Sequence, residues 1–318
     1  FGITTMAVYV NTNVSSLNGQ RYLSNVQNSL NTTYTRLSSG LRINSAKDDA
    51  AGLQIADRLT SQINGLNQGN RNANDGIALA QTIEGGLDEI SNMLQRMRTL
   101  AVQSANGTLG DDDREAIQGE ADQLTAEIQR IATETTFGGK TILSGYKNDG
   151  TTIYADGGAL QINAKNAGCR AELTLHVGAN TNNQIKMTVY SFQFSRLASA
   201  AQLSEATGYS KDGTNNTARI VLDNQKDANN AIKGIDDMIK IVDSQRASLG
   251  AIQNRLESSI RNQSNVSANS ADARSRIRDA DFAEESANLS QQSIIQQAAT
   301  SMLMQANTRP QLALSMLG

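Results

Sequence analysis

Apolar residues recur along both flanks of this chain at the spacing of a helix that packs against a partner helix. In the first flank, Ile83, Leu87, Ile90, Leu94 and Met97 follow one another at intervals of three and four residues. This is the a/d seam of a coiled coil. The pattern predicts long amphipathic helices, and the single Pro in 318 residues leaves them almost uninterrupted.

Four further stretches carry the same spacing. Their apolar residues are Leu23, Val26, Leu30 and Leu37; Ile117, Leu124, Ile128 and Ile131; Ile232, Ile235, Ile239, Val242, Leu249, Ile252, Leu256 and Ile260; and Leu289, Ile295, Ala299, Met302 and Ala306. An ordinary helical bundle accounts for such a core, so the pattern alone leaves open whether copies of the chain assemble.

Capping residues predict where these helices begin and end. Gly40 is suited to end the first helix in a left-handed conformation, and Ser45 with Asp48 to cap the next. Residues 106–110 contain two glycines and predict a break, after which the acidic run 111–113 favours the start of a third helix.

The middle of the chain differs from its flanks because it alternates. Two runs carry an apolar residue at every second position, formed by Leu173, Leu175 and Val177 and by Ile185, Met187 and Val189. This period predicts a two-stranded hairpin with one apolar face. We also expect a short strand at 151–154 and a short helix at 195–206.

The fold class expected is therefore mainly α: a long coiled-coil-like rod formed by the two flanks, with a small hairpin-containing insert at its far end. Three domains are expected. They are a terminal coiled coil of 7–45 with 279–318, a helical rod with the hairpin of 46–143 with 173–190 and 222–278, and a variable insert of 144–172 with 191–221.

Composition argues against several functional classes. Cys169 is the only Cys and His176 the only His, which excludes an intrachain disulfide and a Cys/His zinc site. The chain contains no run of 18 consecutive apolar residues, so the sequence predicts no membrane-spanning helix. Its net charge of −3 is unlike the basic charge that is typical of nucleic-acid-binding proteins. We expect no enzyme, metal or cofactor: His176 cannot form a zinc-protease motif alone, and 111–113 suits a helix start better than a calcium loop.

Short motifs in both flanks resemble bacterial flagellins. They are 36–52 (RLSSGLRINSAKDDAAG), 71–77 (RNANDGI), 94–107 (LQRMRTLAVQSANG), 245–256 (QRASLGAIQNRL), 277–285 (IRDADFAEE) and 305–312 (QANTRPQL). The resemblance covers about 7–143 and 220–318 and indicates a flagellin with a short insert.

The resemblance implies a structural subunit that polymerises into the flagellar filament used for swimming. In this family the terminal helices line an inner tube and the next helices form an outer tube. The resemblance also implies an extracellular protein exported unfolded without a cleaved signal peptide, with an export chaperone, a cap and junction proteins as partners. The 31 Asn and 25 Gln residues suit this role, because amides provide polar contacts between stacked copies without charge repulsion.

The resemblance also implies recognition of the free monomer by the vertebrate Toll-like flagellin receptor. The matching positions are Gln95, Arg96, Leu100, Gln103 and Glu120. The alternative is that Leu100 packs between subunits while Arg96 and Glu120 are solvated or make assembly contacts.

A cluster of charges lies where the flanks connect. Arg274, Arg276 and Arg278 alternate with acidic residues, and we expect them to pair with Asp48 and Asp49 and with the segment near Arg42. The alternative is a solvated linker.

Two other functions stay open from the sequence. A hook–filament junction protein shares the two-flank plan, although the motifs at 36–52 and 247–256 favour the filament subunit. A flagellin-like surface adhesin would bind a glycan through the insert, with aromatic residues lining an exposed groove. These would be Tyr146, Tyr154, Phe192 and Phe194.

Overall fold

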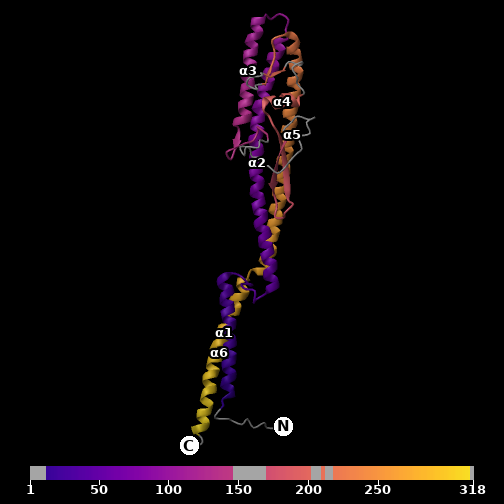
Figure 1. The fold of residues 1–318 in the computed structure, drawn as a ribbon. Coiled ribbons are helices and arrows are strands. Elements are labelled where there is room, and N and C mark those ends of the chain that lie inside the picture. Colours follow the sequence, from indigo (N-terminus) through magenta and orange to yellow (C-terminus); the bar gives the residue numbers. More distant parts are fainter. Residues whose placement is uncertain (1–11, 146–169, 202–208, 212–217, 316–318) are drawn as a thin grey trace. The chain divides into compact units, whose positions relative to one another are not determined.

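The computed structural model describes residues 12–145, 170–201, 209–211 and 218–315, and their contacts divide the chain into two compact units (Figure 1). Unit 1 contains 1–63 and 268–318, and unit 2 contains 64–267. The predicted strand at 151–154 and Cys169 lie outside the described residues. The helices are α1 (Val14–Ser39), α2 (Ala50–Ser104), α3 (Asp111–Glu134), α4 (Phe194–Ala200), α5 (Gln225–Arg278) and α6 (Phe282–Ser315).

The predicted helix ends are confirmed at Gly40 and between α2 and α3. Gly40 has a φ of 71° and its backbone N–H donates to the Arg36 carbonyl over 2.8 Å. The second helix begins differently from the prediction. The Asp48 carboxylate accepts hydrogen bonds from Ser45 and forms a turn before the helix, while Asp49 caps α2 by accepting from the Gly52 N–H at 2.9 Å.

Among the described residues between α3 and α5 there are three small antiparallel pairs of strands. They are β1 (Thr136–Phe137) with β2 (Lys140–Thr141), β3 (Arg170–His176) with β4 (Gln184–Tyr190), and β5 (Tyr209–Lys211) with β6 (Ala218–Ile220). The predicted hairpin is β3–β4, with Leu173 opposite Met187 and Leu175 opposite Ile185. The predicted short helix is α4, which within the described residues starts one residue earlier than expected.

The core of unit 2 lies where α2, α3 and α5 pack together. Ile83, Leu87, Ile90 and Leu94 of α2 are all fully buried, as the heptad spacing predicted, and they join Ile128 of α3 in one apolar cluster. On α5 the buried seam consists of Ile235, Met238, Val242, Leu249 and Leu256. Burial of this seam is the main force that holds the helices together.

The β3–β4 hairpin lies along α2 and α5. Gln245 of α5 donates to the Thr188 carbonyl at 2.9 Å, and Gln263 of α5 donates to the carbonyl of Val177 just after β3. Gly69 of α2 allows the hairpin backbone to approach closely, because a Cβ there would lie 2.6 Å from the Val177 oxygen. The turn between α2 and α3, and not the hairpin, therefore forms one end of unit 2 (Figure 1).

Candidate assembly interface

In unit 1, α1 and α6 pack along a narrow seam. Val26 and Leu30 of α1 and Ala299 of α6 are buried there. Hydrogen bonds close both ends of the seam: Asn13 donates to the Ala306 carbonyl at 2.8 Å, and Arg36 pairs with Glu285 at 3.0 Å. Two helices therefore share a specific register with few buried apolar residues between them.

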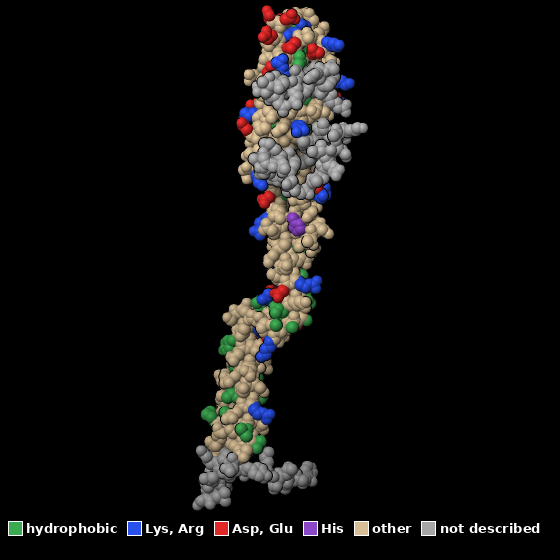
Figure 2. All heavy atoms as spheres, viewed as in Figure 1, with side chains coloured by type: hydrophobic (Ala, Val, Ile, Leu, Met, Phe, Trp, Pro, Cys, Tyr) green, Lys and Arg blue, Asp and Glu red, His purple; other side chains and the backbone are tan. Residues whose placement is uncertain are grey.

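The outward faces of this helix pair carry large apolar side chains. On α1, Leu17, Tyr22 and Tyr34 are each more than half exposed, and on α6 the exposed fractions of Ile294 and Met302 are 67% and 64%. Figure 2 shows such green side chains on the visible face of the pair. Exposed apolar side chains of this size on both helices make this face a candidate contact surface.

The segment between α1 and α2 meets the end of α5 through backbone groups. The Arg42 N–H donates to the Arg278 carbonyl at 2.7 Å, and the Arg42 side chain donates to the Ile277 carbonyl at 2.6 Å. Leu41 forms an isolated antiparallel bridge with Asp279. These contacts join the two flanks at the position where the sequence predicted a connection.

The predicted linker charges have other side-chain partners than Asp48 and Asp49. Arg278 meets Asp57 at 3.9 Å, and Arg274 donates to Thr60 at 3.3 Å. Arg276, largely exposed, pairs with Asp272 one turn earlier on its own helix. Hydrogen bonds from the Ser45 and Asn44 N–H groups and from the Ser45 hydroxyl lower the pKa of Asp48, so its carboxylate stabilises its own turn.

Four of the five expected receptor positions are exposed on α2 and α3 of unit 2, and we call this surface the α2–α3 ridge. Arg96 of α2 and Glu120 of α3 are ion-paired at 2.7 Å, and both side chains are about half exposed. Gln95 and Gln103 are exposed beside them. Leu100 is only 2% exposed and belongs to the core of its own subunit, so it supports the ridge from beneath and does not contribute to its surface.

The aromatic groove expected of a glycan-binding adhesin does not form at Phe192 and Phe194. Both side chains are buried in the core of unit 2, at 0% and 1% exposed. Tyr146 and Tyr154 lie outside the described residues. Phe192 and Phe194 therefore contribute to the apolar core and not to a surface groove.

Within the described ranges, no group of three or more His, Cys, Asp or Glu side chains is placed to hold a metal ion. His176 is exposed at the end of β3, where its backbone carbonyl accepts from Asn72. No described helix combines the length and the apolar character needed to cross a membrane.

Comparisons with known proteins give the family. A model of the bacterial flagellin N-terminal helical region matches residues 10–148, and a model of the C-terminal helical region matches 232–317. Flagellin B of Vibrio cholerae is 37% identical over 377 aligned positions, which cover 98% of this chain and all of the relative. The chain belongs to the bacterial flagellin family. Flagellin A of Vibrio cholerae is 38% identical over 378 positions, with the same coverage of both chains.

This flagellin is thus a structural, non-enzymatic subunit of the extracellular flagellar filament. Among solved structures, a hook-associated protein described as putative, from Vibrio parahaemolyticus, matches with a TM-score of 0.53 and 18% identity, covering 73% of this chain and all of that chain; this likeness concerns the fold alone. A Bacillus cereus flagellin structure matches with a TM-score of 0.41 and 26% identity, over 61% of this chain and 88% of that one.

Proposed function

We propose that copies of this flagellin join through the α1–α6 pair, which lines the inner tube of the filament, while the helices and hairpin of 46–143, 173–190 and 222–278 form the outer tube. The exposed apolar side chains on both helices carry the proposal. Their seam buries few apolar residues, so the pair gains much of its stability only when further copies cover its outer faces. A contact that repeats head to tail without closing produces a helical filament.

This proposal is tested by removing apolar side chains from the outer face of α6. The double substitution Ile294→Ser with Met302→Ser should abolish seeded elongation of filaments, because both side chains would be covered on assembly. Gln291→Ser with Gln297→Ser changes two exposed polar positions of the same helix and serves as the matched control. Normal elongation of the Ile294→Ser/Met302→Ser protein would refute the proposal.

For export, we propose passage of the unfolded chain through a dedicated channel without cleavage of a signal peptide, followed by contacts with a chaperone, a cap and junction proteins. A single Cys supports this route, because no intrachain disulfide has to be broken for threading. Mass spectrometry of protein from filaments should find the encoded N-terminus. A shortened N-terminus left by a signal peptidase would contradict the proposal.

A second proposed activity is recognition of the monomer by the vertebrate Toll-like flagellin receptor through the α2–α3 ridge. The supporting observation is the exposed Arg96–Glu120 ion pair with Gln95 and Gln103 beside it. In this arrangement Leu100 keeps α2 in place, and the polar side chains make the contacts.

Arg98 provides a matched control for this ridge. It is an exposed arginine of the same helix that is also ion-paired, but its partner is Asp236 of α5. Arg96→Ala should reduce receptor signalling by purified monomer, whereas Arg98→Ala should leave it near the wild-type level. Equal signalling by the wild type and Arg96→Ala would contradict this activity.

A further inference from the structure

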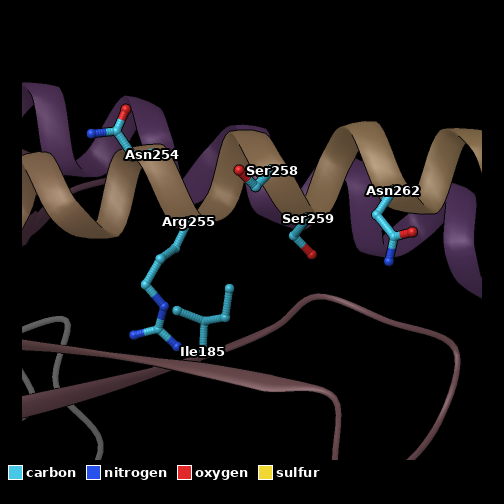
Figure 3. A pocket seen from close by; sticks show the side chains of 6 residues that line it. All are labelled: Ile185, Asn254, Arg255, Ser258, Ser259 and Asn262. Carbon is cyan, nitrogen blue, oxygen red and sulfur yellow. The ribbon is translucent and has the colours of Figure 1, made fainter.

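A shallow groove in unit 2 lies between α5 and the hairpin. It has a volume of about 470 Å³ and is lined by Ile185 of β4 and by Asn254, Arg255, Ser258, Ser259 and Asn262 of α5. Figure 3 shows the Arg255 side chain extending from α5 towards Ile185, with Ser259 and Asn262 on the same side of the helix. Ile185 forms a small apolar floor, and the remaining lining groups are hydroxyls, amides and one guanidinium.

Arg255 differs from the other arginines of α5. Arg246, Arg261, Arg274, Arg276 and Arg278 each form an ion pair or a side-chain hydrogen bond. Arg255 is exposed and has no such partner among the described residues, and no Asp or Glu lines the groove. The Arg255 guanidinium lies on the same side of α5 as the Ser259 hydroxyl and the Asn262 amide. A guanidinium without an acidic partner among the described residues is suited to bind a carboxylate in a bidentate manner.

The end of unit 2 formed by the α2–α3 turn carries the complementary charge. Asp111, Asp112 and Asp113 are exposed in the first turn of α3, and the Asp111 side chain is 100% accessible. Figure 2 shows red side chains gathered at this end of unit 2. Asp113 caps the helix by accepting from Gly110, and Asp112 has no partner among the described residues.

These carboxylates cannot reach the groove of their own subunit. Glu84 of α2 accepts a hydrogen bond from Gln253 of α5, so the groove lies near the level of Glu84 along α2. The helix continues from there to Ser104, which at 1.5 Å per residue separates the groove from the acidic turn by roughly 30 Å. Only a second copy, displaced along the axis of unit 2, can bring the two together.

We infer that the Arg255 groove of one flagellin subunit accepts the exposed carboxylates of the α2–α3 turn of a second copy. The two patches differ, so the contact is heterologous and continues from subunit to subunit, as a filament requires. The inference rests on the polymerisation proposed above and adds a contact between units 2 of neighbouring subunits. The contact is electrostatic and exposed at its rim, so salt weakens it.

The test is seeded elongation of full-length protein, with the critical concentration measured by sedimentation. Arg255→Glu should raise the critical concentration about tenfold or more, since it places a negative charge opposite the carboxylates. Asp112→Arg should have a similar effect. The combined Arg255→Glu/Asp112→Arg protein should return to within about threefold of the wild type, because the reversed charges attract again.

Lys233→Glu is the matched control, since Lys233 is an exposed cation of α5 with no partner among the described residues and lies outside the groove. Neither Arg255 nor Asp112 has an ion pair among the described residues, so circular dichroism should show an unchanged unfolding midpoint for the Arg255→Glu monomer. The midpoint of Asp112→Arg should fall slightly, because Asp112 lies in the first turn of α3, where a carboxylate stabilises the helix. Elongation of Arg255→Glu equal to that of Lys233→Glu would overturn the groove contact. A loss in Arg255→Glu that Asp112→Arg does not restore would overturn the choice of partner. Failure of the α1–α6 proposal would appear separately, as normal elongation of the Ile294→Ser/Met302→Ser protein.

Discussion

Arg36 of α1 donates a hydrogen bond of 3.0 Å to Glu285 of α6, and the Glu285 side chain is only 9% exposed. The pair joins the first flank of the sequence to the last and sets the register of the two terminal helices. Because the carboxylate is almost completely removed from water, its charge depends on Arg36 for compensation.

We therefore predict that Glu285→Gln weakens the filament. The substitution leaves Arg36 without its counter-charge and should cost about 2 kcal/mol, below the full cost of breaking a buried pair because Arg36 is one-third exposed. The thermal depolymerisation midpoint of filaments should fall by several degrees. Glu284→Gln, at the neighbouring exposed position, is the control and should leave the midpoint unchanged.

Two glycines of α2 should respond in opposite ways to alanine. A Cβ at Gly69 would lie 2.6 Å from the Val177 oxygen, so Gly69→Ala must push the hairpin away and should destabilise the monomer by about 2 kcal/mol. A Cβ at Gly85 meets no atom within 4 Å, so Gly85→Ala should stabilise the helix by about 0.5–1 kcal/mol. Urea unfolding measures the change in the free energy of unfolding for each variant. A Gly85→Ala monomer less stable than the wild type would contradict the prediction that the added methyl group meets no neighbouring atom.

The stability of the turn before α2 should depend on pH, because the ionised Asp48 carboxylate accepts the hydrogen bonds that hold this turn. The carboxylate accepts two backbone N–H groups and the Ser45 hydroxyl, so its pKa in the folded chain lies below the ordinary 3.8. The folded pKa is lowered, hence the stabilisation is present above the ordinary pKa and is lost as the pH falls through the lower, folded value. NMR titration of the Asp48 carboxyl carbon should show a midpoint below 3.8.

Ser45→Ala separates the contributions to this shift. The substitution removes the hydroxyl donor and keeps both backbone donors, so the Asp48 pKa should rise but remain below 3.8. An unchanged midpoint would mean that the hydroxyl does not contribute.

The arginines at the end of α5 should differ in importance for assembly. We predict that Arg276→Glu weakens filament assembly without unfolding unit 2, and that Arg278→Glu weakens it more. Arg278 reaches across to Asp57 and is 29% exposed, whereas Arg276 is 79% exposed and pairs within its own helix. Filament yield and the monomer circular dichroism signal measure the two effects. Unchanged assembly of both variants would show that the connection relies on the backbone contacts of Arg42 alone.

Much of the fold followed from local pattern. The three- and four-residue spacing on α2 predicted a buried seam at Ile83, Leu87 and Ile90, because a helix can bury only one stripe. Alternation predicted the β3–β4 hairpin with one apolar face, because successive side chains of a strand point to opposite faces. Gly40 predicted the end of α1, because few other residues adopt a positive φ there.

The sequence by itself therefore determined the helices, the hairpin and, through its motifs, the family. The tertiary structure decided which candidate residues are buried and which are exposed, and with which partners they pair. Leu100 and Phe192 are buried by elements distant in the chain, and Arg278 meets Asp57 because α2 and α5 run side by side there. The groove beside Arg255 arises in the same way, since its walls come from α5 and β4. Such pairings depend on the separation and rotation of packed elements, which no periodicity in a single segment encodes.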